Sequence, residues 1–343
     1  MAAEMRLDMV RNNWVVIATD RAMRPHDFPV SRSGGPGIDS GQFCPFCEGN
    51  EAHTPREVTA CRQDGGEANT PGWKVRIVPN KYSPFRLEGD LSCSELFTQS
   101  SCKTLGQHEV LVESPEHQAQ LHRLPREHIK LILNMMRERY QALAADPRVK
   151  YIQIYKNRGL FAGASLAHSH SQILALPVVP RENQGISDYH RRTGSCLLCE
   201  MIAQEREEGL RVIREMDHFL LLCPYASRFS YESWVIPKRH TAHFGDLNRE
   251  ETDELAFIIR DYLSAVLDSL ADPSYNIVIN TAPVNVPTDS GYHWYMEVIP
   301  RLIVTAGVEY ATGFYMNPVA PEIAADLFRR HLEQSGGQSE QTR

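Results

Sequence analysis

The sequence predicts an α+β fold of two similar halves, in which a mainly antiparallel sheet packs against helices. Three observations carry this prediction. A Cys-x-x-Cys pair followed by two histidines occurs once in each half of the chain. Stretches of alternating apolar and polar residues, typical of half-buried strands, stand between stretches whose apolar residues have helical spacing. Neighbouring strand-like stretches are joined by short polar turns, which favours antiparallel pairing.

The pattern of the first half begins with Cys44-Pro-Phe-Cys47. Residues 109–113 (EVLVE) alternate between apolar and polar side chains and predict a strand, which leads to His117. Residues 151–177 predict a strand, a glycine-containing loop and a second strand with two histidines. Between them, residues 126–146 predict a helix, because apolar side chains recur there on one face: Ile129, Ile132, Leu133, Met136, Tyr140 and Leu143.

The second half repeats this order after Cys196-Leu-Leu-Cys199. Residues 218–240 predict two strands joined by a short polar turn, the second ending at His240. Asn248 followed by Glu251 is typical of a helix start, and apolar residues at helical spacing follow. Two further strands are expected over residues 275–280 and 293–300, the last of which contains His293.

The two halves therefore share the order of their cysteine pair, histidines, helix and strands. His168 follows His117 by 51 residues, and His293 follows His240 by 53. The alternative is that the two halves resemble each other by chance, as segments of a long chain with both helices and strands can. The shared order of cysteine pair and histidines argues against it. We divide the chain into an N-terminal half (1–180), a C-terminal half (181–330) and a disordered polar tail (331–343).

Composition limits the function classes. The chain has 343 residues, of which 42% are hydrophobic and 23% charged, as in an ordinary globular protein. Its formal net charge of -7 argues against a nucleic-acid partner, because such proteins neutralise phosphates with basic residues. No apolar stretch of about 18 residues is present, so we expect no membrane span. The charged N-terminal residues do not resemble a secretory leader, and we expect a cytoplasmic protein.

The paired cysteines and histidines predict two zinc sites per chain, because structural zinc prefers four thiolate and imidazole ligands. A redox role for the cysteine pairs is the alternative. It is disfavoured because Cys44 follows a Gly/Pro/Ser-rich stretch rather than a strand that leads into a helix. Rival histidine ligands are His108, His122, His128, His218 and His243. The proposed ligands are Cys44, Cys47, His117 and His168 for the first site, and Cys196, Cys199, His240 and His293 for the second.

The segment His-Ser-His-Ser-Gln is the candidate catalytic centre. In an extended strand His168, His170 and Gln172 share one face, because alternate side chains point the same way. A neutral imidazole is a competent nucleophile near pH 7, since its ordinary pKa is about 6.5. We expect His170 to be that nucleophile, with its second ring nitrogen held by a backbone carbonyl, while His168 binds metal. Two strand histidines without function are the alternative.

Several motifs in order resemble one known family. They are Cys-Pro-Phe-Cys, Asn80 in VPNKYSPF, ESPEH, KNRGLFAGAS and HSHSQ. Together they are similar to the galactose-1-phosphate uridylyltransferase branch of the histidine triad superfamily, and most similar to its members that act as ADP-glucose phosphorylases. The resemblance runs from Arg21 to about Pro321. It implies two histidine-triad-like repeats and, by analogy, a homodimer.

The resemblance implies a double displacement. His170 would attack the α-phosphorus of a nucleotide sugar and release sugar 1-phosphate, and the nucleotidyl-histidine would pass its nucleotide to a second phosphate acceptor. In the branch that this chain resembles, AMP moves from ADP-glucose to phosphate. A UDP-glucose–hexose-1-phosphate uridylyltransferase is one alternative, with a sugar 1-phosphate as acceptor. A non-catalytic nucleotide-binding zinc protein is another.

Gln172 is expected to take part in catalysis by donating an amide hydrogen to a phosphoryl oxygen. Family hydrolases have a third histidine there, which protonates a basic leaving group. A sugar phosphate leaves without that help, so Gln172 favours transfer between phosphates. In the second half, Tyr295 and Glu297 stand in place of His170 and Gln172. We therefore expect one active centre for the two halves together.

The resemblance also implies substrate-binding residues. For the arginines and for Glu309 a solvated surface charge is the alternative, and for Asn157 a turn cap. The chain departs from the uridylyltransferases proper, which carry Pro and Gly where this chain has Ser169 and Ser171. That departure favours the phosphorylase-like branch. Besides Gln172, the expected substrate contacts are Arg21, Arg24, Asn80, Asn157, Gly163, Ala164, Ser165, Leu166, Val308, Glu309 and Gly313.

Overall fold

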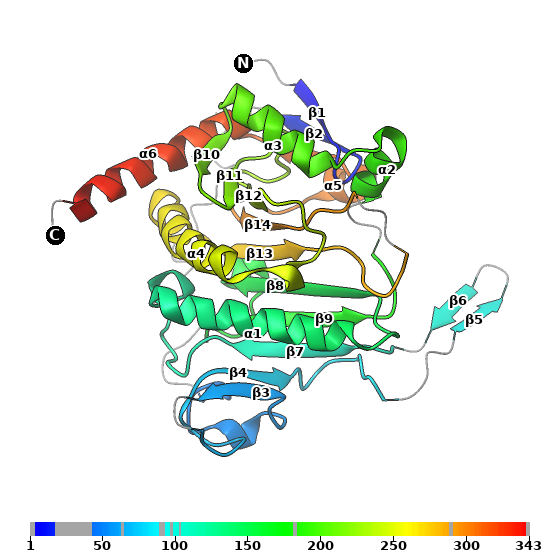
Figure 1. The fold of residues 1–343 in the computed structure, drawn as a ribbon, viewed down its shortest axis with the longest axis vertical. Helices are drawn as coiled ribbons and strands as arrows, with labels where there is room; N and C mark the ends of the chain where they lie inside the picture. The colour runs from blue at the N-terminus through cyan, green and yellow to red at the C-terminus, as the bar shows by residue number, and fades with distance from the viewer. Residues whose placement is uncertain are drawn as a thin grey trace.

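The structure is a computed structural model that describes residues 4–17, 43–62, 65–88, 93–96, 99–102, 104–180, 184–287 and 291–340. Within these residues the fold is α+β, as the sequence predicts, with six α-helices and a large antiparallel sheet (Figure 1). Arg21 and Arg24, two of the expected substrate contacts, lie outside the described residues. None of the described helices is long and apolar enough to span a membrane.

One ten-stranded sheet runs through both halves of the chain, and every neighbouring pair in it is antiparallel. Each half contributes five consecutive strands, and the halves join where β13 pairs with β8. Across the sheet the strands are β10 (Val212–Glu215), β11 (Phe219–Leu222), β12 (Ser233–Pro237), β14 (Tyr295–Pro300), β13 (Tyr275–Asn280), β8 (Tyr151–Arg158), β9 (His170–Leu176), β7 (Gln107–Val112), β4 (Trp73–Pro79) and β3 (Thr59–Arg62).

The strand order reads as a palindrome about the β13–β8 pair. β9 occupies the place in the first half that β14 occupies in the second, and β7 corresponds in the same way to β12. The helices follow the same symmetry, because α1 (Arg126–Ala144) precedes β8 and α4 (Arg249–Ser269) precedes β13. This geometry supports the sequence-based inference of two repeated halves.

Helices α1 and α4 pack side by side on one face of the sheet (Figure 1). The apolar stripe predicted for the first helix is buried there, with Ile129 and Leu133 in one large core. Asn248 caps α4: its side chain accepts from the Glu251 amide, while the Glu251 carboxylate accepts from the Asn248 amide. The long helix α6 (Pro321–Glu340) joins the same core through Phe328.

The opposite face of the sheet differs between the halves. In the second half it is covered by α2 (Gln184–Thr193), by α3 (Leu197–Glu208) and by Val10 of the turn that joins β1 (Glu4–Asp8) to β2 (Asn13–Ile17). Among the described residues of the first half, the same face carries a small cluster around Val110 and Val112, and a pocket opens beside it. This difference places the candidate site in the first half.

The remaining elements are short. β15 (Tyr315–Asn317) pairs in parallel with β2, and β5 pairs with β6 in a hairpin that projects from the body (Figure 1). The bounds of the other short elements are β5 (Cys93–Leu96), β6 (Gln99–Cys102), α5 (Gly307–Thr312), η2 (Glu51–His53), η3 (Leu121–Arg123), η4 (Leu160–Ala162) and η5 (Phe244–Asp246).

Two expected boundaries differ from the structure. The strand expected from residue 293 begins at Tyr295, because the Trp294 amide donates to the Thr241 carbonyl outside the sheet ladder. We expected a disordered tail from residue 331, but α6 continues through this position to Glu340. Leu332 explains the difference: it is buried in the main core one turn after Phe328, so the start of this segment is tied to the fold.

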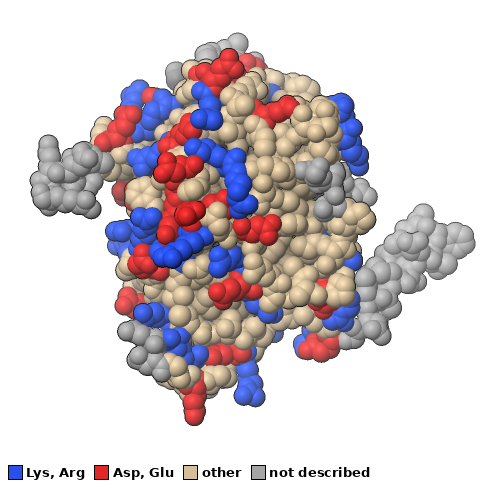
Figure 2. All heavy atoms as spheres, viewed as in Figure 1, with Lys and Arg blue, Asp and Glu red and all other residues tan. Residues whose placement is uncertain are grey.

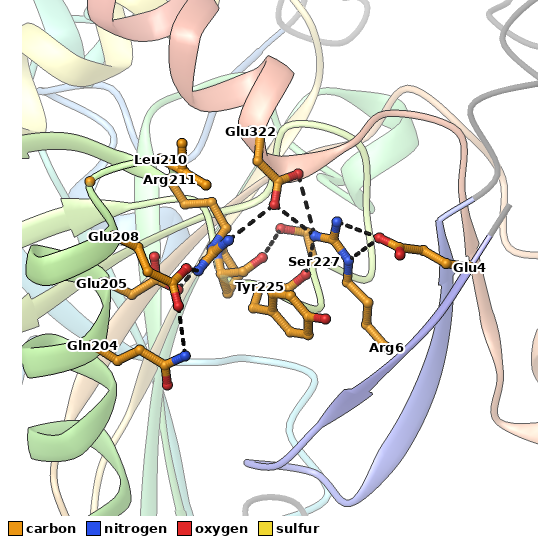
Figure 3. A network of polar contacts seen from close by, with 12 residues as sticks. Glu4, Arg6, Gln204, Glu205, Glu208, Leu210, Arg211, Tyr225, Ser227 and Glu322 are labelled. Carbon is orange, nitrogen blue, oxygen red and sulfur yellow. Dashed lines mark hydrogen bonds and ion pairs between the residues drawn. The ribbon is translucent and has the colours of Figure 1, made fainter. Parts of the chain in front are cut away.

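A network of ion pairs joins β1, at the start of the chain, to helices α3 and α6 of the second half (Figure 3). Arg211, which is 4% exposed, pairs with Glu205 and Glu208 from α3 and with Glu322 from α6. Arg6 from β1 also pairs with Glu322. Both guanidinium groups stack on the Tyr225 ring, at 4.4 Å for Arg6 and 5.1 Å for Arg211. The network thereby ties β1, α3 and α6 to one another.

Surface charge on the face drawn in Figure 2 is mixed. Acidic and basic residues are interspersed there, and an uncharged region lies beside them. This face therefore does not offer the continuous basic track that nucleic-acid binding needs.

Candidate active site and metal centres

The four ligands predicted for the first metal site meet at one point. The Sγ atoms of Cys44 and Cys47 lie 3.6 and 3.7 Å from Nδ1 of His168, and Cys47 Sγ lies 3.1 Å from Nδ1 of His117. All four ligand atoms lie within 4.8 Å of one another. With the usual bond lengths to zinc, tetrahedral sulfur and nitrogen ligands lie about 3.6 Å apart. The donor set therefore fits a zinc ion.

The second predicted set has the same geometry. Cys196 and Cys199, at the start of α3, lie 3.6 and 3.5 Å from Nδ1 of His293, and Cys199 lies 3.5 Å from Nδ1 of His240. The Nε2 atom of His293 donates to the Pro237 carbonyl at 2.9 Å. In the first site His168 Nε2 donates in the same way to a carbonyl, that of residue 114, at 2.7 Å. Such bonds fix the tautomer that turns Nδ1 toward a metal.

His170 opens strand β9 and faces the pocket of the first half. Its Nδ1–H donates to the His168 carbonyl at 2.8 Å, as the sequence led us to expect of the nucleophile. This bond leaves the lone pair of the imidazole on Nε2. Burial lowers the pKa of His170, so the imidazole is neutral at pH 7. Burial also lowers the pKa of the neighbouring His168, to about 4.

A buried ion pair supports the strand from the side opposite the pocket. Lys156 donates to the Glu113 carboxylate at 2.8 Å, to the Ser169 hydroxyl at 3.0 Å and to the His170 carbonyl at 3.1 Å. Glu113 accepts from both serines of the motif, Ser169 and Ser171. Burial alone would raise the pKa of Glu113, but the Lys156 ammonium holds it below its ordinary value.

This network gives the two motif serines a structural role. Ser169 and Ser171 alternate with His170 along β9 and point to the helix side of the sheet. There they meet a glutamate that needs donors and a lysine that uses all three of its own. The departure from Pro and Gly noted in the sequence is therefore part of the scaffold that holds His170.

Gln172 also faces the pocket, two residues further along β9. Its Oε1 accepts from Nε2 of His108 at 2.8 Å and from the Tyr155 hydroxyl at 2.9 Å. His108 also lies near Asn80, whose Nδ2 is 3.4 Å from His108 Nδ1. Four polar side chains from β7, β8, β9 and the loop after β4 are thus linked, and two of them, Asn80 and Gln172, line the pocket.

The pocket has a volume of about 550 Å³ and is lined by Phe46, Asn80, Val110, Ser165, His170 and Gln172, among others. A nucleotide sugar needs a site of this size. Leu166 also lines it. Three predicted contacts, Asn80, Ser165 and Leu166, therefore stand together with the predicted nucleophile.

The glycine loop is organised differently from the expected phosphate cradle. The amides of Gly163 and Ala164 donate to the Leu160 and Gly159 carbonyls, so they stabilise the turn itself. Gly163 has a φ of 80°, which favours glycine. The amide oxygen of Asn157 accepts from Asn276 at 2.8 Å, which secures the base of this loop. Of the loop residues that we expected to donate backbone amides to phosphate, Ser165 and Leu166 therefore remain as candidates.

Val308, Glu309 and Gly313 lie away from His170 in the single chain. Val308 and Glu309 belong to α5, and Gly313 ends that helix with a φ of 71°. Glu309 accepts from the Ala306 amide at the start of α5 and lines a small recess with Arg228. The structure therefore does not bring these three expected contacts into the pocket of the first half.

The second half fills the place where a matching site would be. Tyr295 and Glu297, the counterparts of His170 and Gln172, are fully buried. Glu297 pairs with Arg11, from the turn between β1 and β2, and with Arg228. Because two guanidinium groups occupy this position, the described residues of the second half offer neither a histidine in the place of His170 nor an open pocket beside it.

Sequence reasoning missed four residues of the site. Glu113, Lys156 and Tyr155 were not singled out, and His108 entered only as a rival metal ligand. Glu113 stood inside the quoted motif ESPEH, and Lys156 and Tyr155 lie just before Asn157. The strand alternation that grouped His168 with His170 could also have assigned these neighbours to faces. Their pairing across strands depends on register, which one sequence does not give.

Comparison with known proteins identifies the family of the chain. Residues 1–180 match the galactose-1-phosphate uridyl transferase N-terminal domain, and residues 182–335 match the C-terminal domain of the same family. The chain therefore belongs to the galactose-1-phosphate uridyl transferase family.

Within that family the chain is similar to two kinds of enzyme. It is 36% identical to ADP-glucose phosphorylase of Arabidopsis thaliana, over 95% of this chain and 92% of the relative. It is 30% identical to galactose-1-phosphate uridylyltransferase of Thermotoga maritima, over 95% of this chain and 98% of the relative. The crystal structure of the Arabidopsis ADP-glucose phosphorylase with bound ADP-glucose matches with a TM-score of 0.79 at 35% identity, covering 96% of this chain and 99% of that one.

Proposed function

We propose that the chain is an ADP-glucose phosphorylase, which transfers AMP from ADP-glucose to phosphate through a nucleotidyl group on His170. The observation that carries this proposal is the setting of His170. Its Nδ1 is tied to a carbonyl, its Nε2 is left to react, and it lines a nucleotide-sized pocket beside Gln172. The 36% identity to the Arabidopsis phosphorylase supports the choice of substrate.

The mechanism follows from the positions of the nitrogen atoms. Nε2 of His170 attacks the α-phosphorus of ADP-glucose, a P–N bond forms, and the P–O bond to glucose 1-phosphate breaks. The positive charge that develops on the imidazole is stabilised by the His168 carbonyl, which accepts from Nδ1–H. Phosphate then attacks the same phosphorus, the P–N bond breaks, and ADP leaves. Gln172 donates to the phosphoryl oxygen that gains charge in both steps.

We propose zinc at both four-ligand sites, one held by Cys44, Cys47, His117 and His168 and the other by Cys196, Cys199, His240 and His293. Zinc would supply rigidity rather than chemistry, since each set provides four protein ligands and leaves no open position. In the first half that rigidity reaches the nucleophile, because the carbonyl of the ligand His168 holds His170.

We further propose that the enzyme works as a homodimer of chains with N-terminal halves at 1–180 and C-terminal halves at 181–330. A second copy would supply the expected contacts Val308, Glu309 and Gly313, which lie outside the pocket of their own chain. The exposed apolar side chains of Val304 and Tyr310 on and beside α5 suit such a contact. Cys61 and Cys223, which lie outside both proposed zinc sites, are free thiols, and this suits the reducing cytoplasm that we propose as its location.

The proposal is tested by following products from four mixtures: ADP-glucose or UDP-glucose as donor, each with phosphate or galactose 1-phosphate as acceptor. We expect ADP and glucose 1-phosphate from ADP-glucose and phosphate at the highest kcat/KM. His170→Asn should abolish the reaction, and His122→Asn, a histidine outside the pocket, should retain it. Faster turnover of UDP-glucose with galactose 1-phosphate would identify a uridylyltransferase instead, which the 30% identity to the Thermotoga enzyme makes the second candidate.

A further inference from the structure

The orientation of the Gln172 amide decides what it can do. An amide has an oxygen that only accepts and a nitrogen that only donates. To stabilise a phosphoryl oxygen beside His170, the nitrogen must face the pocket and the oxygen must be held elsewhere. The contacts around Gln172 determine which end faces the pocket.

The direction of these contacts is set by a backbone amide, whose N–H can only donate. The amide of Tyr82 donates to Oδ1 of Asn80 at 3.0 Å, so Nδ2 of Asn80 is the end that faces His108. Nδ1 of His108 must then accept, and the proton of this imidazole resides on Nε2. Nε2 donates to Oε1 of Gln172 at 2.8 Å.

A second donor acts on the same oxygen. The Tyr155 hydroxyl, on the neighbouring strand, donates to Oε1 of Gln172 at 2.9 Å. Burial raises the pKa of Tyr155 and lowers the pKa of His108, which keeps the phenol protonated and the imidazole neutral at pH 7. With both bonds on Oε1, Nε2 of Gln172 is the end that remains for the pocket.

The second half lacks this arrangement, although its strands have the same register. Gln172 pairs with Tyr155 on β8, and its counterpart Glu297 pairs with Val278 on β13. The position that corresponds to His108, two residues before the partner on the neighbouring strand, is Glu232. The directed chain of donors therefore occurs in the half that has the nucleophile.

We propose that His108 and Tyr155 are positioning residues, which hold Oε1 of Gln172 so that its Nε2 donates to the phosphoryl oxygen of the nucleotide sugar at His170. This inference rests on the function proposed above. It extends that function by naming two residues that do not touch the reacting atoms and act only through Gln172.

A double-mutant cycle tests the proposal, with the release of glucose 1-phosphate from ADP-glucose as the readout. Gln172→Ala should lower kcat about 100-fold, as the loss of one such donor does. His108→Phe and Tyr155→Phe should each lower kcat about 5- to 10-fold, the value of one hydrogen bond, with little change in KM. His108→Gln, which keeps a donor, should recover most of that loss. In the Gln172→Ala background neither Phe substitution should lower kcat by more than about 2-fold.

Tyr151→Phe is the matched control, because its hydroxyl lies on the same strand and donates to Gln153 instead. It should leave kcat within about 2-fold of the wild type in both backgrounds. The proposal is overturned if the Tyr155 and His108 effects persist in full without Gln172, or if Tyr151→Phe has the same effect as Tyr155→Phe.

A second readout separates this proposal from the proposed function. In protein labelled with ¹⁵N glutamine, the side-chain amide of Gln172 is the signal that Gln172→Ala removes. It should be rigid in the wild type and in Tyr151→Phe, and mobile in the His108→Phe/Tyr155→Phe variant. This measurement needs no turnover. If the Gln172 amide stays rigid in that double variant, the positioning role is overturned, even when the enzyme is active. If the wild type shows a rigid amide but does not turn over ADP-glucose, only the choice of substrate is overturned.

Discussion

The buried ion pair beneath His170 should dominate the stability of the first half. Glu113→Gln is a nearly isosteric change that leaves the Lys156 ammonium without its counter-charge. The side chains of Glu113 and Lys156 are 0% and 5% exposed, so water cannot replace the missing charge. Removing one partner of such a pair costs about 3–5 kcal/mol of unfolding free energy.

Removing both charges should be far less damaging. Glu113→Gln combined with Lys156→Met deletes the ammonium, and the new amide can accept from one of the two serine hydroxyls and donate to the other. We expect the double variant to regain at least about 2 kcal/mol relative to Glu113→Gln alone. It should not regain full activity, because the lysine's bond to the His170 carbonyl is lost.

The assay is urea denaturation followed by circular dichroism, with zinc in excess and the slope m compared between variants. Glu127→Gln is the matched control, because Glu127 pairs with Lys130 but is 79% exposed, and it should change stability by less than about 1 kcal/mol. The reasoning is refuted if Glu113→Gln costs no more than this control, or if the double variant loses the sum of both single losses.

Three further predictions concern metal, pH and the second half. Cys44→Ser, or a strong chelator, should lower the free energy of unfolding by about 3–4 kcal/mol, because the zinc that stabilises the fold is lost. Cys61→Ser should leave it unchanged. Thermal melts with and without added zinc measure the difference. Burial lowers the pKa of His122 to about 4, below its ordinary value of about 6.5, so the unfolded chain takes up a proton there that the folded chain does not. The free energy of unfolding should therefore fall as the pH falls from 6.5 to 4. In denaturation series at several pH values, His122→Gln should depend less steeply on pH than the wild type. An equally steep pH dependence in the two proteins would contradict this prediction. Arg211→Met should cost about 3 kcal/mol and leave kcat unchanged, since its network ties α3 to α6 away from the pocket, while the exposed Arg206→Met should be neutral. A large loss of kcat in Arg211→Met would show that the network reaches the site.

The sequence was most informative where chemistry depends on local motifs. Each Cys-x-x-Cys pair is a local turn, and its histidines recur at nearly the same spacing in both halves, so the four-residue groups could be proposed without a structure. The structure brings both groups together with distances that fit zinc. The same holds for His170, because strand alternation and the bond expected from Nδ1 are properties of neighbouring residues.

Features that depend on packing between distant segments could not be predicted. The two halves form one continuous sheet because β13 pairs with β8, and no local sequence pattern predicts this pairing. Arg11 contacts Glu297, which lies 286 residues later in the sequence, and thereby fills the position that corresponds to the pocket in the second half. The position of Glu309, outside the pocket, depends on how α5 packs. The role of His108 likewise required the register of β7 against β9.

The central claim is that His170 carries the nucleotide between the two half-reactions. The most direct test mixes the protein with ADP-glucose in the absence of phosphate, stops the reaction in base and measures peptide masses. We expect one glucose 1-phosphate released per chain and the peptide with residues 151–177 heavier by one AMP group, and added phosphate should discharge it as ADP. An unmodified peptide from an enzyme that still turns over ADP-glucose would contradict the account.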